Sequence, residues 1–345
     1  MNYKNFGRGT GLRVSELVLG CGTFGTRWGY GAEPGEALAM FNLYADHGGN
    51  FIDTADSYQV GQSEELIGEF LAGRRNEFVL ASKYTLGGPG KGATGTGNSR
   101  QVMVASLEAS LKRLKTDRID LYWVHMPDGL TASEEIMRAM DDLVSAGKVN
   151  YIGLSDFPAW RVARAATIAE IRGWAPVIAI QMEYSLIERT PDRELIPMAE
   201  ALGLGMVGWS PLAGGLLTGK YRRGEEGRAT TFKRLIHAED DVRKKGIVDV
   251  LLEIAAELAV TPGEVALAWM SSRGVLPIIG PRTREQLAEN LAATEISLND
   301  SQLTRLTAAS AIPLGFPHDF LSDPAQRTRL TGGQPEQVAP LTPIA

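Results

Sequence analysis

Short apolar segments recur along the chain, and between them lie stretches in which apolar residues return every three or four positions. Most of the short segments are apolar throughout, which is typical of parallel strands covered on both faces. We expect eight strands, at residues 17–21, 51–55, 78–83, 119–125, 149–155, 177–183, 205–211 and 276–281. Eight strands that alternate with helices favour an α/β fold of the (β/α)8 type, the TIM barrel.

Two of the intervening stretches carry clear helix signals. Residues 99–115 begin at Ser99, a suitable N-cap, and residues 133–148 end near Gly147, which suits a helix C-terminus. A doubly wound sheet is the alternative fold, but its phosphate-binding glycine motif is missing. The glycine cluster "GRGTG" at 7–11 precedes the first core strand and opens no helix. We therefore interpret it as the turn of an N-terminal hairpin.

No break in composition divides the chain, so we predict a single domain over residues 1–345 with its core at about 15–312. Glycine-rich and irregular stretches predict a loop at 87–98 after the third strand and a long loop at 212–240 after the seventh. The tail, residues 313–345, is rich in Pro and Gly, and we expect it to wrap the barrel.

The composition mainly excludes certain partners, disulfides and membrane spans. The 35 Lys and Arg residues against 41 Asp and Glu give a net charge of −6, which disfavours nucleic acid and anionic membranes as partners. Cys21 is the only cysteine, so an intramolecular disulfide is excluded and a reducing compartment fits. The first residues contain no apolar signal core, and no segment approaches the roughly 18 apolar residues of a membrane span. We expect a cytoplasmic protein.

Polar side chains gather where the predicted strands end, which is where a barrel carries its active site. Asp53 and Tyr58 follow the second strand, Lys83 ends the third and His125 ends the fourth. Taken singly, each has a plain structural interpretation; an Asp–Lys pair, for example, is more often a structural ion pair. Consecutive strands of a right-handed barrel are neighbours, so all four side chains should meet. Their convergence favours a catalytic site.

Such a cluster suits the protonation of an alkoxide. The ammonium of Lys83 should lower the pKa of Tyr58 from its ordinary value of about 10, and Asp53 would keep Lys83 charged and oriented. His125 could donate a hydrogen bond to a carbonyl oxygen as negative charge develops on it. Carbonyl reduction by hydride transfer is such a reaction, and it needs a nicotinamide cofactor.

Other motifs in the sequence do not indicate a different function. The four histidines lie far apart with no metal-binding spacing, so we expect no metal site. The loop "GGLLTGKY" at 214–221 comes close to a Walker motif, but Tyr221 stands where Ser or Thr should bind magnesium. Its glycines and Lys220 could instead wrap a cofactor pyrophosphate.

These segments resemble the aldo-keto reductase family over nearly the whole chain. The similar motifs, in order, are "FIDTADSY" (51–58), "LASKY" (80–84), "LYWVHMPD" (121–128), "GKVNYIGLSDF" (147–157), "IQMEYSL" (180–186), "GWSPLAGGLLTGKY" (208–221) and "IIGPRTREQLAEN" (278–290). Seven motifs in the right order are much more specific than one. In style they are most similar to bacterial members related to the potassium-channel β-subunit group.

The resemblance implies Asp53, Tyr58, Lys83 and His125 as a catalytic tetrad with Tyr58 as general acid. It implies a cofactor site made of Gly22, Thr23, Asp53, Ser155, Asp156, Gln181, Trp209, Ser210, Pro211, Leu212, Gly214, Leu216, Gly219, Lys220, Arg228, Gly280, Arg282, Gln286, Glu289 and Asn290. In that site Ser155 and Gln181 would hold the carboxamide, and Trp209 would stack on the nicotinamide ring. An arginine at 282 suits a 2′-phosphate, which favours NADPH over NADH.

One position departs from the family pattern, because Asp156 stands where the family commonly has Asn. An ionised Asp can accept a hydrogen bond from the carboxamide amino group but cannot donate one to its oxygen. This leaves the details of nicotinamide binding open and does not change the expected reaction.

We therefore predict a reductase that uses NADPH to convert an aldehyde or ketone into an alcohol. The substrate residues would be Trp28, Tyr58, Tyr84, His125 and Met126, in a pocket suited to bulky ketones such as keto-sugars, keto-steroids or xenobiotics. Two alternatives stay open: an NADPH-binding regulatory or sensor subunit with little turnover, and a barrel enzyme that acts on phosphorylated sugars. A small carbonyl compound is the expected partner, and a homo-oligomer stays open as well.

Overall fold

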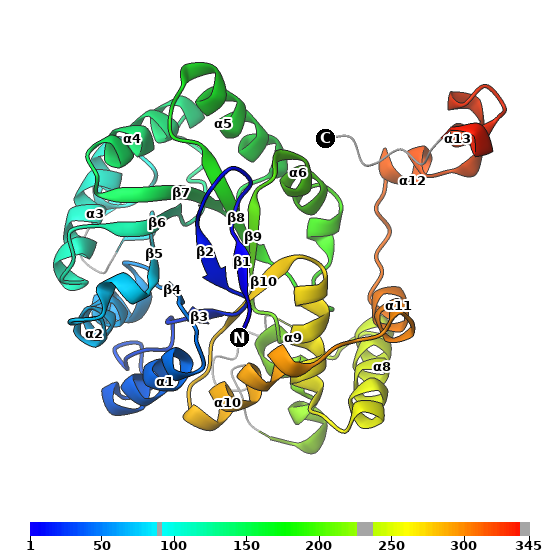
Figure 1. Ribbon diagram of the computed structural model, residues 1–345, viewed down its shortest axis with the longest axis horizontal. Coiled ribbons are helices and arrows are strands. Elements are labelled where there is room, and N and C mark those ends of the chain that lie inside the picture. Colours follow the sequence, from blue (N-terminus) through cyan, green and yellow to red (C-terminus); the bar gives the residue numbers. More distant parts are fainter. Residues whose placement is uncertain (88–91, 226–236, 339–345) are drawn as a thin grey trace.

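The centre of the protein is a closed barrel of eight parallel strands in the order β10-β3-β4-β5-β6-β7-β8-β9 (Figure 1). The computed structural model describes residues 1–87, 92–225 and 237–338. The barrel strands are β3 (Val18–Gly20), β4 (Phe51–Asp53), β5 (Val79–Tyr84), β6 (Ile119–Val124), β7 (Val149–Ser155), β8 (Val177–Glu183), β9 (Gly205–Trp209) and β10 (Val275–Ile279). Each expected strand is present, and the predicted (β/α)8 barrel is confirmed.

Helices surround the barrel on its outer side (Figure 1). They are α1 (Pro34–Asp46), α2 (Gln62–Phe70), α3 (Arg100–Arg113), α4 (Ser133–Ser145), α5 (Ala159–Arg172), α6 (Leu195–Leu202), α8 (Val242–Leu258), α9 (Pro262–Ser272), α10 (Arg284–Ala292) and α11 (Asp300–Ala309). The predicted signals of α3 and α4 are confirmed. The Ser99 side chain accepts a hydrogen bond from the Val102 amide, and Gly147 follows α4 with a φ of 70°.

We expect loss of the N-cap of α3 to weaken the fold measurably. Replacing Ser99 with Ala should lower the free energy of unfolding by about 1 kcal/mol, because the Val102 amide loses its acceptor. Urea denaturation measures this change. Ser99→Asp keeps an acceptor at the same place and should stay close to the wild type, whereas equal losses in both variants would contradict the capping role.

An antiparallel hairpin of β1 (Tyr3–Asn5) and β2 (Arg13–Ser15) crosses one end of the barrel, as the turn at 7–11 predicted (Figure 1). Phe6, which directly follows β1, packs edge to face on Phe51, the first residue of β4, with ring centroids 5.4 Å apart. Both residues belong to the apolar cluster that fills the barrel interior. The hairpin therefore closes the N-terminal end of the barrel and leaves the C-terminal end for a site.

The described part of the tail, residues 313–338, does not wrap the barrel, so that expectation is wrong for these residues. Its two short helices, α12 (His318–Leu321) and α13 (Pro324–Leu330), project outward in Figure 1. The tail contacts the barrel where His318 Nε2 lies 2.8 Å from Glu194 Oε1, at the start of α6. Pro313 and Pro317 interrupt any helix that could lie along the barrel wall. The loop predicted at 87–98 lies partly outside the described residues. So does the loop predicted at 212–240, whose first part forms short 3₁₀ turns at Ala213–Thr218 and Lys220–Arg223.

Candidate active site

Four polar side chains from consecutive parts of the barrel meet at its C-terminal end. The Lys83 ammonium donates hydrogen bonds to the Asp53 carboxylate, to the Thr54 carbonyl oxygen at 2.9 Å and to the Tyr58 hydroxyl at 3.1 Å. The rings of Tyr58 and His125 meet edge to face with centroids 5.8 Å apart. The structure thus brings together Asp53, Tyr58, Lys83 and His125, as their positions at the strand ends predicted.

Strand alternation explains which residues reach this cluster and corrects one expected substrate residue. Side chains point to opposite faces along a strand, and in β5 the residues Val79 and Ala81 fill the barrel interior. Lys83 shares their parity and points inward, so Tyr84 points outward. There Tyr84 is buried and stacks on Tyr122, with centroids 5.4 Å apart. Tyr84 therefore does not line the pocket.

Of two further expected substrate residues, one lies at the pocket wall and the other does not. Trp28 lines the pocket and packs edge to face on Tyr58, with centroids 6.0 Å apart. Met126 is not among the lining residues; it follows the inward-facing His125, and its carbonyl oxygen accepts a hydrogen bond from Asn98 at 3.0 Å. The pocket wall therefore does not include Met126, and its role toward a substrate stays a prediction.

The expected effect of Lys83 on Tyr58 is outweighed by burial. Desolvation raises the pKa of Tyr58 above its ordinary value of 10, although Lys83 acts in the opposite direction. Burial also acts to lower the pKa of Lys83, but Asp53 and Tyr58 outweigh it and raise that pKa. At neutral pH the pair is therefore a protonated phenol beside an ammonium, a proton donor next to a fixed positive charge.

Two buried polar atoms at this end of the pocket have no hydrogen-bond partner within the part of the chain that the structure describes: His125 Nδ1 and Ser155 Oγ. Burial, helped by Lys83, lowers the pKa of His125 to about 3, so its imidazole is neutral at physiological pH. Buried polar atoms are normally paired. Both residues also line the pocket, and a neutral imidazole and a hydroxyl with unpaired polar atoms there fit a polar ligand.

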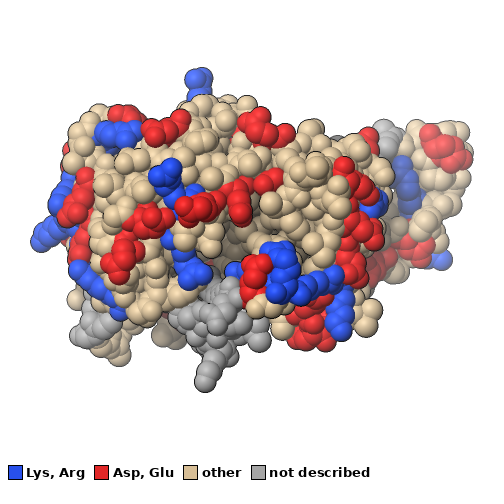
Figure 2. Space-filling view, turned by 90° about the horizontal axis from the view of Figure 1, so that it is seen from below, with Lys and Arg blue, Asp and Glu red and all other residues tan. Residues whose placement is uncertain are grey.

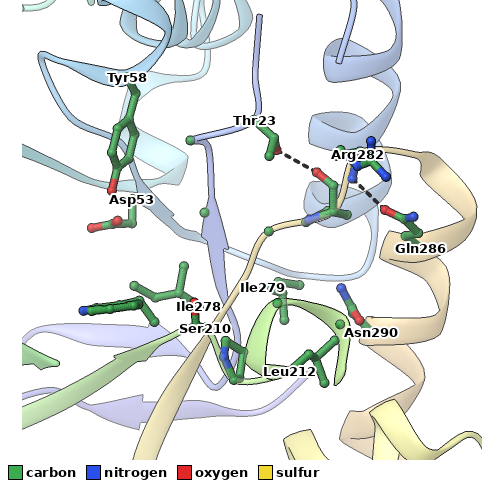
Figure 3. A pocket seen from close by; sticks show the side chains of 18 of the residues that line it. Thr23, Asp53, Tyr58, Ser210, Leu212, Ile278, Ile279, Arg282, Gln286 and Asn290 are labelled. Carbon is green, nitrogen blue, oxygen red and sulfur yellow. Dashed lines mark hydrogen bonds between the residues drawn. The ribbon is translucent and has the colours of Figure 1, made fainter. Parts of the chain in front are cut away.

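A pocket of about 450 Å³ begins at the tetrad and extends to the first turns of α10 (Figure 3). Figure 3 shows Asp53 and Tyr58 at one end, with Arg282, Gln286 and Asn290 at the other. Its lining residues are Gly20, Gly22, Thr23, Trp28, Tyr30, Asp53, Tyr58, His125, Ser155, Asp156, Gln181, Trp209, Ser210, Pro211, Leu212, Gly214, Gly215, Thr218, Lys220, Ile278, Ile279, Gly280, Pro281, Arg282, Gln286, Glu289 and Asn290. An elongated pocket of this kind suits a dinucleotide.

The far end of the pocket carries positive charge. Lys220 and Arg282 both line it, and burial together with the Arg282 charge lowers the pKa of Lys220. The Arg282 guanidinium lies over the Tyr30 ring, 4.5 Å from the centroid. Two cations that repel each other across an open pocket fit an anionic group such as a phosphate. On the face shown in Figure 2, by contrast, acidic and basic side chains are interspersed.

Most residues of the expected cofactor site line this pocket. Among the exceptions, Leu216 is buried in the core between barrel and helices, Gly219 is not a lining residue, and Arg228 lies outside the described residues. Sequence reasoning missed Tyr30, Gly20, Gly215, Thr218, Ile278, Ile279 and Pro281. The two isoleucines end the eighth strand and could have been found from that position, whereas Tyr30 carried no signal.

Comparison with known proteins decides the family. Residues 16–311 match the model of the Aldo/keto reductase family. The chain belongs to this family. It is 36% identical over 336 residues to norsolorinic acid reductase of Aspergillus flavus, covering 93% of this chain and 85% of the relative. It is 40% identical over 319 residues to the uncharacterized oxidoreductase YrpG of Bacillus subtilis, with coverages of 89% and 94%.

A further relative is an aryl-alcohol dehydrogenase of Pestalotiopsis microspora, 35% identical over 321 residues, with coverages of 90% and 82%. As an aldo/keto reductase the protein is an oxidoreductase, and its family generally uses a nicotinamide cofactor. Within residues 1–87, 92–225 and 237–338, no helix is both long and apolar enough to cross a membrane. Nor do those residues contain a group of three or more His, Cys, Asp or Glu side chains placed to hold a metal ion.

Proposed function

We propose that this aldo/keto reductase uses NADPH to reduce an aldehyde or ketone to the alcohol, with Tyr58 as the general acid. The observation that carries the proposal is the buried Lys83, which contacts both the Asp53 carboxylate and the Tyr58 hydroxyl at the end of the long pocket. At its other end that pocket offers two cations to the phosphates of a dinucleotide.

The tetrad supports a division of roles. Bound NADPH would supply a hydride to the carbonyl carbon. Tyr58 would donate its proton to the carbonyl oxygen, and the Lys83 ammonium, 3.1 Å from the hydroxyl, would stabilise the phenolate that remains. Asp53 would keep Lys83 charged and in place. The neutral His125 would donate a hydrogen bond to the same carbonyl oxygen as charge develops on it.

The nicotinamide end of the cofactor would lie against β7, β8 and β9. Gln181 uses its amino group to donate to Asp53 at 3.1 Å, so its carbonyl oxygen remains to accept from a carboxamide. The unpaired hydroxyl of Ser155 would complete that contact. Trp209 lines the same end of the pocket and offers its indole face to the ring.

The preference for NADPH rests on Arg282. Replacing Arg282 with Ala should weaken NADPH binding roughly ten- to hundredfold, because the 2′-phosphate loses a charge-assisted hydrogen bond. NADH lacks that phosphate, so its dissociation constant should change much less. Titration calorimetry with both cofactors measures the two effects. Arg284→Ala is the matched control, since Arg284 is exposed and is not a lining residue; equal losses for NADH and NADPH in R282A would contradict this role.

The substrate end of the pocket favours aromatic carbonyl compounds. Trp28, 46% exposed, packs on Tyr58 and presents an indole beside the reactive hydroxyl. The name of one relative, aryl-alcohol dehydrogenase, supports the same class. The test is a panel of aryl and alkyl aldehydes and ketones, followed by the absorbance of NADPH. Turnover restricted to alkyl compounds would contradict the substrate class, and tight NADPH binding without any turnover would favour a sensor.

A further inference from the structure

The carboxylate of Asp156 lies at the reactive end of the pocket, yet it has no part in the proton transfer described above. Asp156 follows β7 directly, and its φ of 56° marks a left-handed turn at the strand end. The residue lines the pocket next to Ser155. The Trp209 indole Nε1 donates a hydrogen bond to Asp156 Oδ1 at 3.0 Å. The carboxylate is therefore fixed beside the indole that is proposed to face the nicotinamide ring.

The charge of Asp156 is close enough to the catalytic groups to act on them. Although Asp156 is exposed as a residue, desolvation of its carboxylate at the pocket wall raises the pKa to about 6. The Trp209 hydrogen bond and Lys83 oppose that rise, and Glu183 assists it. Asp156 in turn raises the pKa of Tyr58. The pKa values of Tyr58 and Lys83 are raised, and that of His125 lies at about 3. Of these catalytic groups and Asp156, only Asp156 changes its charge between about pH 5 and 8.

We propose that Asp156 makes this site discriminate between the oxidised and the reduced cofactor. The inference rests on the proposed function, because it requires a nicotinamide at this end of the pocket. Loss of a hydride leaves the ring with a positive charge, whereas the reduced ring is neutral. An ionised carboxylate fixed nearby stabilises the cation and not the neutral ring. The site should therefore prefer NADP⁺ when Asp156 is ionised and lose that preference when Asp156 is protonated.

The test is a binding measurement that needs no turnover. The dissociation constants of NADP⁺ and NADPH are measured by quenching of tryptophan fluorescence between about pH 4 and 8, on both sides of the pKa of about 6 of the Asp156 carboxyl. The ratio of the NADPH constant to the NADP⁺ constant should rise by about tenfold with pH, as expected for one charge pair in a partly hydrated pocket. Both cofactors carry the same 2′-phosphate, which itself titrates near pH 6, and the ratio cancels that contribution.

Two variants distinguish the effect of the Asp156 charge from the effect of a neighbouring charge. Asp156→Asn keeps an oxygen that can accept from Trp209, and it should hold the ratio constant at its low-pH value. Glu183→Gln is the matched control. Glu183 ends the neighbouring strand, pairs with His237 at 2.7 Å and raises the pKa of Asp156. E183Q should keep the rise in the ratio and move its midpoint to lower pH.

The outcomes distinguish the two proposals. A ratio that stays constant with pH in the wild type, or the same rise in D156N, overturns the role of Asp156. Failure of both dinucleotides to bind at any pH overturns the proposed function instead. If D156N does not fold, the wild-type profile and the E183Q midpoint still decide the question.

Discussion

Replacing Tyr58 with Phe should lower kcat for carbonyl reduction by roughly 10² to 10⁴, the usual contribution of a positioned proton donor. Phe keeps the ring that packs edge to face on Trp28 and His125, and it removes only the hydroxyl and its hydrogen bond to Lys83. The dissociation constant of NADPH should therefore stay close to the wild-type value. Steady-state assays of NADPH absorbance, together with fluorescence titration of the cofactor, measure both quantities.

Tyr84→Phe is the matched control for this experiment. Tyr84 follows directly after Lys83, but its ring is buried against Tyr122 outside the barrel, and its hydroxyl donates a hydrogen bond to the Asn98 carbonyl oxygen at 3.4 Å. Loss of that hydroxyl should leave kcat within about twofold of the wild type. A Tyr58→Phe variant that folds, binds NADPH and turns over at the wild-type rate would rule out Tyr58 as the acid.

The barrel could be predicted from sequence because its strands leave an unusual pattern. Strands buried on both faces are short, continuous apolar runs, and their spacing by helical stretches allows few other folds. The hairpin at the N-terminus was predictable from a glycine turn placed before the first core strand. The tail was not, since it lacks a periodic apolar stripe and its path depends on contacts that have no sequence signal.

The sequence predicted at which strand ends the site residues lie, but it did not predict in which direction their side chains point. Asp53, Lys83 and His125 could be placed because barrel strands carry polar residues at one common end. Tyr84 was misplaced because it follows the inward-facing Lys83 on the same strand and therefore points away from the pocket. The protonation of Tyr58 was misjudged for a different reason. Its neighbour Lys83 was visible in the sequence, whereas the extent of burial, which dominates its pKa, depends on the whole fold.

Removal of the Lys83 charge should destabilise the protein more than any of the other substitutions proposed here. Lys83→Met would leave the Asp53 carboxylate, only 3% exposed, without its cation. Loss of one partner of a buried ion pair typically costs about 3–5 kcal/mol, so the free energy of unfolding in urea should fall by that amount. The exposed pair Lys115–Glu69 offers the control, because Lys115→Met should change stability by at most about 1 kcal/mol.

A double variant tests whether the loss arises from the unpaired charge or from altered packing. Asp53→Asn removes the charge but keeps an oxygen that can accept from Gln181, which donates to Asp53 at 3.1 Å. In the combined D53N/K83M variant, no uncompensated charge remains at this place, so part of the stability lost in K83M should return. If the two losses simply add, the destabilisation comes from packing around the Lys83 side chain. Recovery would instead show that Asp53 needs Lys83 as its counter-charge, whatever reaction the site performs.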